Sequence, residues 1–120
     1  MVQVLLFMFL CHIIDDFVLQ PVKLSLLKQK CNYKNISKLY KYDYLMAMFI
    51  HCLSWSIMIH IPILCMGVDT TILFCSIIVN LIIHFIVDHL KCNTHKINLI
   101  IDQTIHFIQI IVTFLIFKYL

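Results

Sequence analysis

Histidine and aspartate residues stand four apart in three apolar segments of this chain. The pairs are His12 with Asp16, His84 with Asp88, and Asp102 with His106. Residues four apart lie on the same face of an α-helix, so the two side chains of each pair are neighbours. Ionisable groups are costly inside an apolar segment, and their repeated pairing there indicates a functional site. Imidazole and carboxylate groups bind divalent metals and transfer protons, so metal binding or acid–base catalysis is the chemistry expected.

The segments that carry these pairs have the length and composition of membrane spans. Hydrophobic residues make up 62% of the 120 residues and charged residues 12%. A water-soluble domain of this size needs far more polar surface. Four apolar segments, residues 2–19, 44–66, 71–90 and 97–117, approach the roughly 20 residues that cross the hydrocarbon core of a bilayer. The sequence therefore predicts an all-α protein, a bundle of four transmembrane helices that forms a single integral membrane domain over residues 1–120.

The lysines predict how the spans are oriented. The chain has nine Lys and no Arg, and six of the lysines lie in the first connector, two in the third and none in the second. Because basic connectors stay in the cytoplasm, we expect the first and third connectors inside and both termini outside. Only Lys118, near the C-terminus, departs from this distribution.

The first connector, residues 21–43, also predicts a short basic helix at the membrane surface between the first two spans. Pro21 fits the first turn of such a helix. Apolar residues such as Leu24 and Leu27 would rest on the membrane while the lysines face lipid phosphates. The bilayer, with anionic lipid at this connector, is therefore the expected partner. Nucleic acid is not expected, because charge alone is nonspecific and membrane topology already accounts for the lysines.

With this topology, all four spans place ionisable groups in one layer. At about 1.5 Å of rise per residue, the three His/Asp pairs and His51 of the second span fall roughly 3–14 Å from the cytoplasmic ends of their helices. Alternate spans run in opposite directions, so unrelated polar residues would not coincide in depth. Polar residues belong inside a bundle, since lipid offers them no hydrogen-bond partners. We therefore expect a polar bundle interior that faces the cytoplasm.

A longer pattern of polar residues extends across the chain. It contains His12, Asp16-Phe17 and Gln20; a mid-chain His51; His84-Phe85 with Asp88 and Lys91; and Asp102-Gln103 with His106. In this pattern the chain resembles the domain-of-unknown-function family 3307, small polytopic membrane proteins of bacteria and their phages. Asp15 stands where the family pattern has a small apolar residue, so the resemblance gives Asp15 no site role. The resemblance implies the membrane fold and a bacterial inner membrane, but no reaction or substrate.

The polar layer has enough ligands for one or two divalent ions, and neutral imidazole and carboxylate suit zinc, iron or manganese. The candidate metal ligands are His12, Asp16, His51, His84, Asp88, Asp102 and His106. The three aspartates among them are also candidate catalytic acids or bases: Asp16, Asp88 and Asp102. The amides of Gln20 and Gln103 would contact a cofactor or a substrate.

Functions of three different classes fit this pattern. The first is a metal-dependent hydrolase of a lipid-linked or amphiphilic substrate, in which metal-bound hydroxide attacks at the inner leaflet. The second is a channel or transporter for protons or metal ions, which needs polar residues that continue to the outer face. The third is a noncatalytic phage or bacterial protein that interacts with other membrane components. The pairs would then only hydrogen-bond between helices and fix their register.

Other residues carry weaker functional signals. His60, in the outer half of the second span, and Trp55, near its middle, are interpreted as packing residues. The six cysteines show no paired spacing, and several lie in spans where a thiol behaves as a small hydrophobe. Disulfides are therefore not expected.

Overall fold

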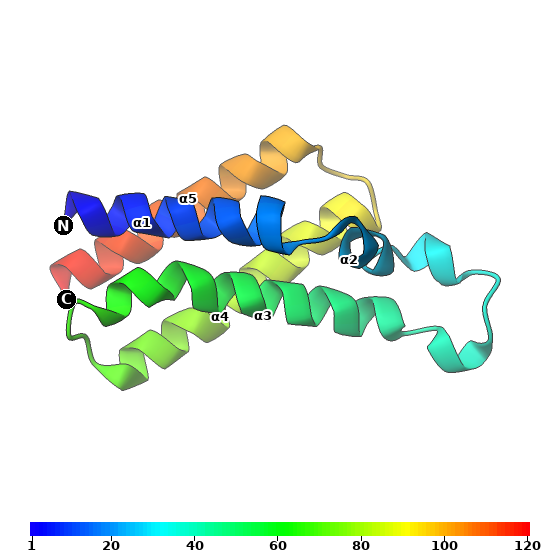
Figure 1. The fold of residues 1–120 in the computed structure, drawn as a ribbon, viewed down its shortest axis with the longest axis horizontal. Helices are drawn as coiled ribbons and strands as arrows, with labels where there is room; N and C mark the ends of the chain where they lie inside the picture. The colour runs from blue at the N-terminus through cyan, green and yellow to red at the C-terminus, as the bar shows by residue number, and fades with distance from the viewer.

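The computed structural model describes residues 1–120 as a bundle of four long helical segments without strands (Figure 1). The segments are α1 (Val2–Ile13), continued by the π-helix η1 (Ile14–Leu19), then α3 (Asp43–Leu64), α4 (Thr70–Cys92) and α5 (Leu99–Tyr119). Each segment is long and apolar enough to cross a membrane. The predicted spans are confirmed, and their ends lie within one turn of the observed helix ends.

Three short helical segments occupy the basic connector between η1 and α3. They are α2 (Val22–Leu27), η2 (Lys30–Tyr33) and η3 (Lys38–Tyr40). Pro21 directly precedes α2, with a φ of −66° that suits the start of a helix. The predicted short helix between the first two spans is therefore confirmed.

Local signals fix the ends of α4 and α5. Asp69 accepts hydrogen bonds from two backbone N–H groups in the first turn of α4, at 2.8 and 3.1 Å, and Asn98 accepts one in the first turn of α5 at 2.9 Å. Such side-chain caps satisfy N–H groups that have no partner within the helix. Gly67, in the turn between α3 and α4, has a φ of 68°, a conformation that glycine adopts without steric cost.

The long helices pack in a closed ring, in which α1 and α4 each contact both α3 and α5. Figure 1 shows α1 and α3 side by side, with α4 and α5 passing behind them. Both termini and the α3–α4 turn lie at one end of the bundle, and the lysine-rich connector extends from the other end. Consecutive spans therefore run in opposite directions, so all four can contribute side chains to one layer.

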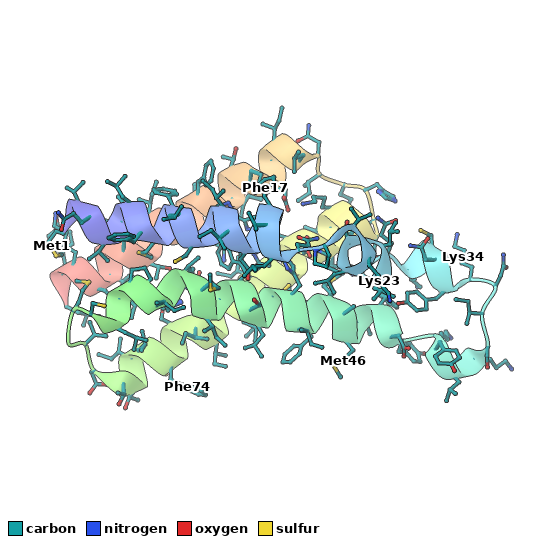
Figure 2. All side chains as sticks on the ribbon, in the orientation of Figure 1. Met1, Phe17, Lys23, Lys34, Met46 and Phe74 are labelled. Atoms are coloured by element: carbon teal, nitrogen blue, oxygen red, sulfur yellow. The ribbon has the colours of Figure 1, made fainter.

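An apolar core fills the half of the bundle nearer the termini. Its buried residues are Met8, Trp55, Ile59, Ile63, Leu73, Ile110, Phe114 and Phe117. Large apolar side chains also cover the outside of the bundle, among them Phe17 and Phe74, which are 59% and 64% exposed (Figure 2). So extensive an apolar surface is suited to lipid rather than water. The chain is therefore described as an integral membrane protein.

Candidate functional site

Histidines and aspartates from all four long segments meet inside the half of the bundle next to the connector. The members that are at most 3% exposed are His12, Asp15, His51, His84, Asp88, Asp102 and His106. The side chain of Asp16 joins them and is 8% exposed. We call these eight residues the His/Asp cluster. The prediction that the spans bring their ionisable groups together is confirmed.

A π-helix positions the two adjacent aspartates of the first span. Residues 14–19 form η1, in which backbone hydrogen bonds run from residue i to i+5. This wider turn brings consecutive side chains closer to one face than an α-helix does, so Asp15 and Asp16 both reach the bundle interior. π-Helical turns are rare and occur frequently at functional sites.

Asp16, His51 and His84 bring three potential metal ligands together. One donor atom from each residue lies within 4.8 Å of the other two. His51 Nε2 is 3.3 Å from His84 Nε2 and 3.4 Å from Asp16 Oδ1. A tetrahedral zinc ion with bonds of about 2.0–2.1 Å holds its ligand atoms about 3.3–3.4 Å apart. The spacing of these three side chains therefore fits a divalent ion bound between η1, α3 and α4.

Four polar atoms of the cluster are buried without a hydrogen-bond partner. They are Asp15 Oδ2, Asp16 Oδ1, His84 Nδ1 and Asp102 Oδ1. Buried polar atoms are usually paired, because an unpaired one loses its hydration without compensation. Asp16 Oδ1 is the atom that faces His51 Nε2. A cation bound at this point would satisfy it.

The charges in the cluster do not balance. Four aspartates are buried there and only two lysines pair with them: Asp15, Asp16, Asp88, Asp102, Lys28 and Lys91. With neutral imidazoles, four negative and two positive charges leave a net charge of −2. Uncompensated charge is unfavourable in a low-dielectric interior. One divalent cation would neutralise the cluster.

His12 holds the Asp16 carboxylate through Gln103. Trp55 Nε1 donates to His12 Nδ1 at 2.7 Å, so His12 Nε2 carries the proton and donates to Gln103 Oε1 at 3.1 Å. Gln103 Nε2 then donates to Asp16 Oδ2 and to Asp102 Oδ2, each at 3.1 Å. Both ring nitrogens of His12 are used in these contacts. Trp55 is fully buried, as its interpretation as a packing residue requires, and its hydrogen bond also fixes the tautomer of His12.

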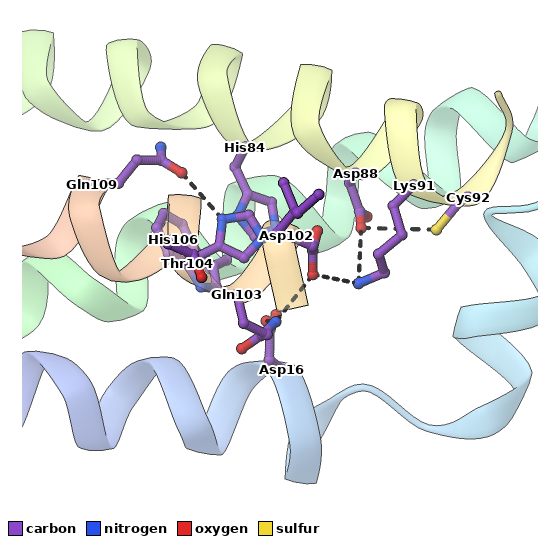
Figure 3. A network of polar contacts seen from close by, with 12 residues as sticks. Asp16, His84, Asp88, Lys91, Cys92, Asp102, Gln103, Thr104, His106 and Gln109 are labelled. Carbon is purple, nitrogen blue, oxygen red and sulfur yellow. Dashed lines mark hydrogen bonds and ion pairs between the residues drawn. The ribbon is translucent and has the colours of Figure 1, made fainter. Parts of the chain in front are cut away.

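Asp102 contacts Lys91 and His106 on the α5 side of the cluster (Figure 3). Lys91 Nζ donates to Asp102 Oδ2 at 2.6 Å, and His106 Nε2 is 3.3 Å from Asp102 Oδ1. The other ring nitrogen of His106, Nδ1, is 3.1 Å from Gln109 Oε1. The rings of His106 and His84 stack, with their centroids 4.1 Å apart. Asp102 and His106 therefore lie beside the three potential ligands and help to orient them.

A protein-family match covers almost the whole chain. The model of a family described as "Protein of unknown function (DUF3307)" matches residues 4–120. The chain belongs to this family. No curated protein and no solved structure matches the chain. The resemblance inferred from the sequence is confirmed, and the DUF3307 match includes every residue of the His/Asp cluster.

The structure adds Asp15 to the buried residues of this DUF3307 chain and corrects the position expected for Lys28. Asp15, which was given no site role, accepts a hydrogen bond from Ser54 Oγ at 2.5 Å, and its Oδ2 is 3.8 Å from His51 Nδ1. Lys28, which was expected to face lipid phosphates, is 1% exposed and donates to Asp88 Oδ2 at 2.6 Å. A second acid inside an apolar span is a sequence signal for Asp15. Lys28 is one of six lysines in the first connector, and nothing in the sequence distinguishes it as the buried one.

A groove beside the cluster reaches the outside of the bundle. Its volume is about 380 Å³, with five polar and four apolar lining residues: Asp16, Gln20, Ser25, Lys91, Gln103, Phe17, Val22, Leu26 and Leu99. Gln20 and Gln103, the predicted contacts to a cofactor or substrate, both line this groove. Asp16 belongs to the groove wall and to the group of three potential ligands. The groove therefore reaches the Asp16 carboxylate from the bundle surface, whereas His51 and His84 do not line it.

A second buried polar group lies nearer the termini. Asn80 Nδ2 donates to Thr113 Oγ1 at 2.9 Å, and Gln109 Nε2 donates to Asn80 Oδ1 at 3.2 Å. We call these three residues the amide network. His60 is separate from it and contacts the Ser56 carbonyl oxygen and the Ser76 hydroxyl at 2.7 and 2.8 Å, as its interpretation as a packing residue predicts. All six cysteines are free, as expected.

Proposed function

We propose that this membrane protein holds one divalent metal ion between Asp16, His51 and His84 and uses it to hydrolyse a lipid-linked or amphiphilic substrate. The observation that carries the proposal is the convergence of three donor atoms from three helical segments within 4.8 Å. The unpartnered Asp16 Oδ1 and the net negative charge of the cluster support it independently.

Asp15 positions His51 in this proposal. In metal sites, a ligating histidine usually donates its other N–H group to a carboxylate or a carbonyl. Asp15 Oδ2 is 3.8 Å from His51 Nδ1 while His51 Nε2 faces Asp16 and His84. Ser54 fixes the Asp15 carboxylate from the same helix that carries His51. Asp15 Oδ2 has no hydrogen-bond partner in the structure, so a small approach of the two groups on metal binding would let His51 Nδ1 donate to it. Asp15 would then orient the imidazole without itself being a ligand.

The remaining candidates of the sequence analysis support the metal or its reaction. His12, Asp102 and His106 orient the Asp16 carboxylate and the His84 ring. Asp88 is the best placed acid or base, since its Oδ2 lies 4.0 Å from His51 Nε2 and its charge is kept by Lys28. A divalent ion with three protein ligands retains a position for water and makes that water a source of hydroxide near neutral pH.

The groove favours an amphiphilic substrate. Its polar residues lie on the side of the cluster, whereas Phe17, Val22 and Leu26 are at least half exposed on the outside of the bundle. A polar headgroup would contact Gln20, Gln103 and the ion, and a hydrocarbon chain would follow the apolar residues. Such a substrate enters sideways from the lipid, so the reaction needs no soluble domain.

The positive-inside tendency supports a cytoplasmic position for the end that carries the site. That end bears the lysine-rich connector, whereas the opposite α3–α4 turn has no lysine. The termini would then lie outside. Lys30, Lys34, Lys38 and Lys41 line a hollow of about 320 Å³ on the connector, which we propose as the contact for anionic lipid of the inner leaflet.

Ion transport is the less favoured alternative. A conducting path needs polar groups that continue through the bundle. Beyond the cluster, polar contacts continue into the amide network, whose Gln109 Oε1 is 3.1 Å from His106 Nδ1. Toward the termini, the interior is formed by the apolar core, which includes Ile63, Leu73 and Phe117. This apolar half of the interior argues against a continuous polar path across the bundle.

Metal content of the purified protein tests the proposal. The wild-type protein, purified in detergent and loaded with zinc or manganese, is expected to retain about one ion per chain after removal of free metal, measured by elemental mass spectrometry. His51→Ala and His84→Ala are expected to retain none. His60→Ala is the matched control, because His60 is a buried histidine of α3 outside the cluster, and it should retain one ion.

Hydrolysis is tested separately with a panel of amphiphilic esters and phosphoesters in mixed micelles. Metal-loaded wild-type protein is expected to hydrolyse at least one class, and chelation or Asp88→Asn should abolish turnover. Folded wild-type protein that binds no metal would refute the metal site. A protein that binds one ion but hydrolyses nothing in the panel would refute the hydrolase assignment.

A further inference from the structure

A second group of potential ligands overlaps the proposed metal site. Cys52, His84 and Asp88 are all buried, and one donor atom from each lies within 4.8 Å of the other two. His84 belongs to both groups, so the two sets are alternatives for a single ion. They differ in chemistry, because Asp16 and His51 supply oxygen and nitrogen whereas Cys52 supplies sulfur.

Lys28 forms an ion pair with Asp88, the carboxylate of the second group. Its Nζ is 2.6 Å from Asp88 Oδ2, and both side chains are 2% exposed. Asp88 Oδ2 is also the oxygen that lies 4.0 Å from His51 Nε2, on the side of the cluster that faces the metal ligands. A divalent ion bound to this oxygen would lie next to an ammonium group of like charge, and their repulsion disfavours binding there.

Hydrogen bonds fix the backbone around Lys28 to the end of α4. The position of the Lys28 side chain is therefore defined by the backbone as well as by its ion pair. Asn93 Nδ2 donates to the carbonyl oxygen of Lys28 at 3.2 Å, and the backbone N–H of Lys30 donates to Asn93 Oδ1 at 2.7 Å. These two contacts hold the segment between α2 and η2 against the helix that carries Asp88. Lys28 thus reaches the cluster from a segment with a defined position.

We propose that Lys28 selects which ligand set binds the ion. By holding Asp88, Lys28 keeps Cys52 out of the coordination sphere and directs the ion to Asp16, His51 and His84. The inference rests on the proposed metal site and adds the element that sets its selectivity. Thiolate ligands favour zinc and softer ions, whereas sites of oxygen and nitrogen also suit manganese and iron. Lys28 therefore favours the harder ions at this site.

Cobalt(II) spectroscopy tests this selection, because cobalt bound to a thiolate shows a sulfur-to-metal charge-transfer band. Wild-type protein loaded with cobalt is expected to bind one ion and show no such band. Lys28→Met is expected to bind one ion and gain the band, and Lys28→Met with Cys52→Ser should lose it again. Lys23→Met is the matched control, since Lys23 is an exposed lysine of α2, and its spectrum should equal that of the wild type.

Lys28→Gln provides a second variant if Lys28→Met does not fold. A glutamine amide can still donate a hydrogen bond to Asp88 but carries no charge, so the band is again expected. Folded Lys28 variants that bind one cobalt ion without a charge-transfer band would overturn the selection by Lys28. Absence of cobalt from the wild-type protein would instead refute the metal site itself, so the two failures are distinguishable.

Discussion

The His/Asp cluster and the amide network are neighbouring buried polar groups, joined by the contact between His106 Nδ1 and Gln109 Oε1, but only the amide network has all its buried polar atoms paired. In the amide network, Asn80, Gln109 and Thr113 form hydrogen bonds with one another and none has a buried atom without a partner. The His/Asp cluster leaves four such atoms and, with neutral imidazoles and ionised aspartates, a net charge of −2. A network that only fixes helix register would resemble the amide network.

This difference separates a structural role from a binding role. Neutral hydrogen bonds between membrane helices stabilise a bundle modestly, and they do so without any ligand. Buried carboxylates require a counter-charge, which the chain supplies for two of its four clustered aspartates through Lys28 and Lys91. The missing counter-charge is what we assign to a metal ion. Four predictions test this assignment.

The largest effect is expected when an internal counter-charge is removed. In metal-free protein, Lys28→Met removes the closest cation from buried Asp88 and leaves only Lys91, 4.0 Å from its Oδ1. We expect the free energy of unfolding to fall by about 3–5 kcal/mol. Reversible unfolding in detergent, with a chelator present, measures this loss. A loss below about 1 kcal/mol, the value typical of exposed pairs, would show that the ion pair is not a buried one.

Added metal should stabilise the wild-type protein and a variant outside the cluster, but not a variant that lacks a metal ligand. At a free metal concentration of 100 times Kd, we expect wild-type protein and His60→Ala to gain about 2.7 kcal/mol. Asp16→Asn should gain almost nothing, because it loses the ligand that reaches the groove. The same unfolding assay measures both. An equal gain in Asp16→Asn would place the ion elsewhere.

Loss of a positioning residue should have an intermediate effect. Asp15→Asn keeps the shape of the side chain but weakens the orientation of His51, so metal affinity should fall about 10–100-fold. Ser54→Ala should lower it less, since Asp15 itself remains. Competition with a chromophoric chelator gives both constants. If Asp15→Asn bound metal as tightly as wild type, the role of Asp15 would be limited to packing.

The smallest effect is expected in the amide network. Thr113→Val removes one of the two acceptors of Asn80 Nδ2, the other being the Ser76 carbonyl oxygen. The free energy of unfolding should fall by about 0.6 kcal/mol, the mean for hydrogen bonds between membrane helices. Metal affinity should not change. A change in metal affinity as large as that of Asp15→Asn would contradict the separation of the two regions.

The spans, their order and the polar layer could be predicted from the sequence because they depend on local features. Apolar length defines the spans, and Gly67, Asp69 and Asn98 mark their ends. A spacing of four defines one helix face, which put His and Asp side chains inside the bundle. Antiparallel order then brought them to one layer.

The arrangement within the layer depends on contacts between distant residues, which local pattern does not contain. The π-helix that turns Asp15 inward packs against α3, where Ser54 donates a hydrogen bond to the Asp15 carboxylate and His51 lies 3.8 Å from it. Lys28 is buried because of an aspartate 60 positions away. Both ring nitrogens of His12 are already used in hydrogen bonds, which excludes this predicted ligand from the group of three, and that is a property of the folded chain.

The most direct test of the metal site is a crystal structure of zinc-loaded protein with anomalous scattering measured on both sides of the zinc absorption edge. We predict one strong peak at about 2.0–2.2 Å from Asp16 Oδ1, His51 Nε2 and His84 Nε2. A map with no peak at these three atoms, from crystals in which zinc is present in the solvent, would contradict it.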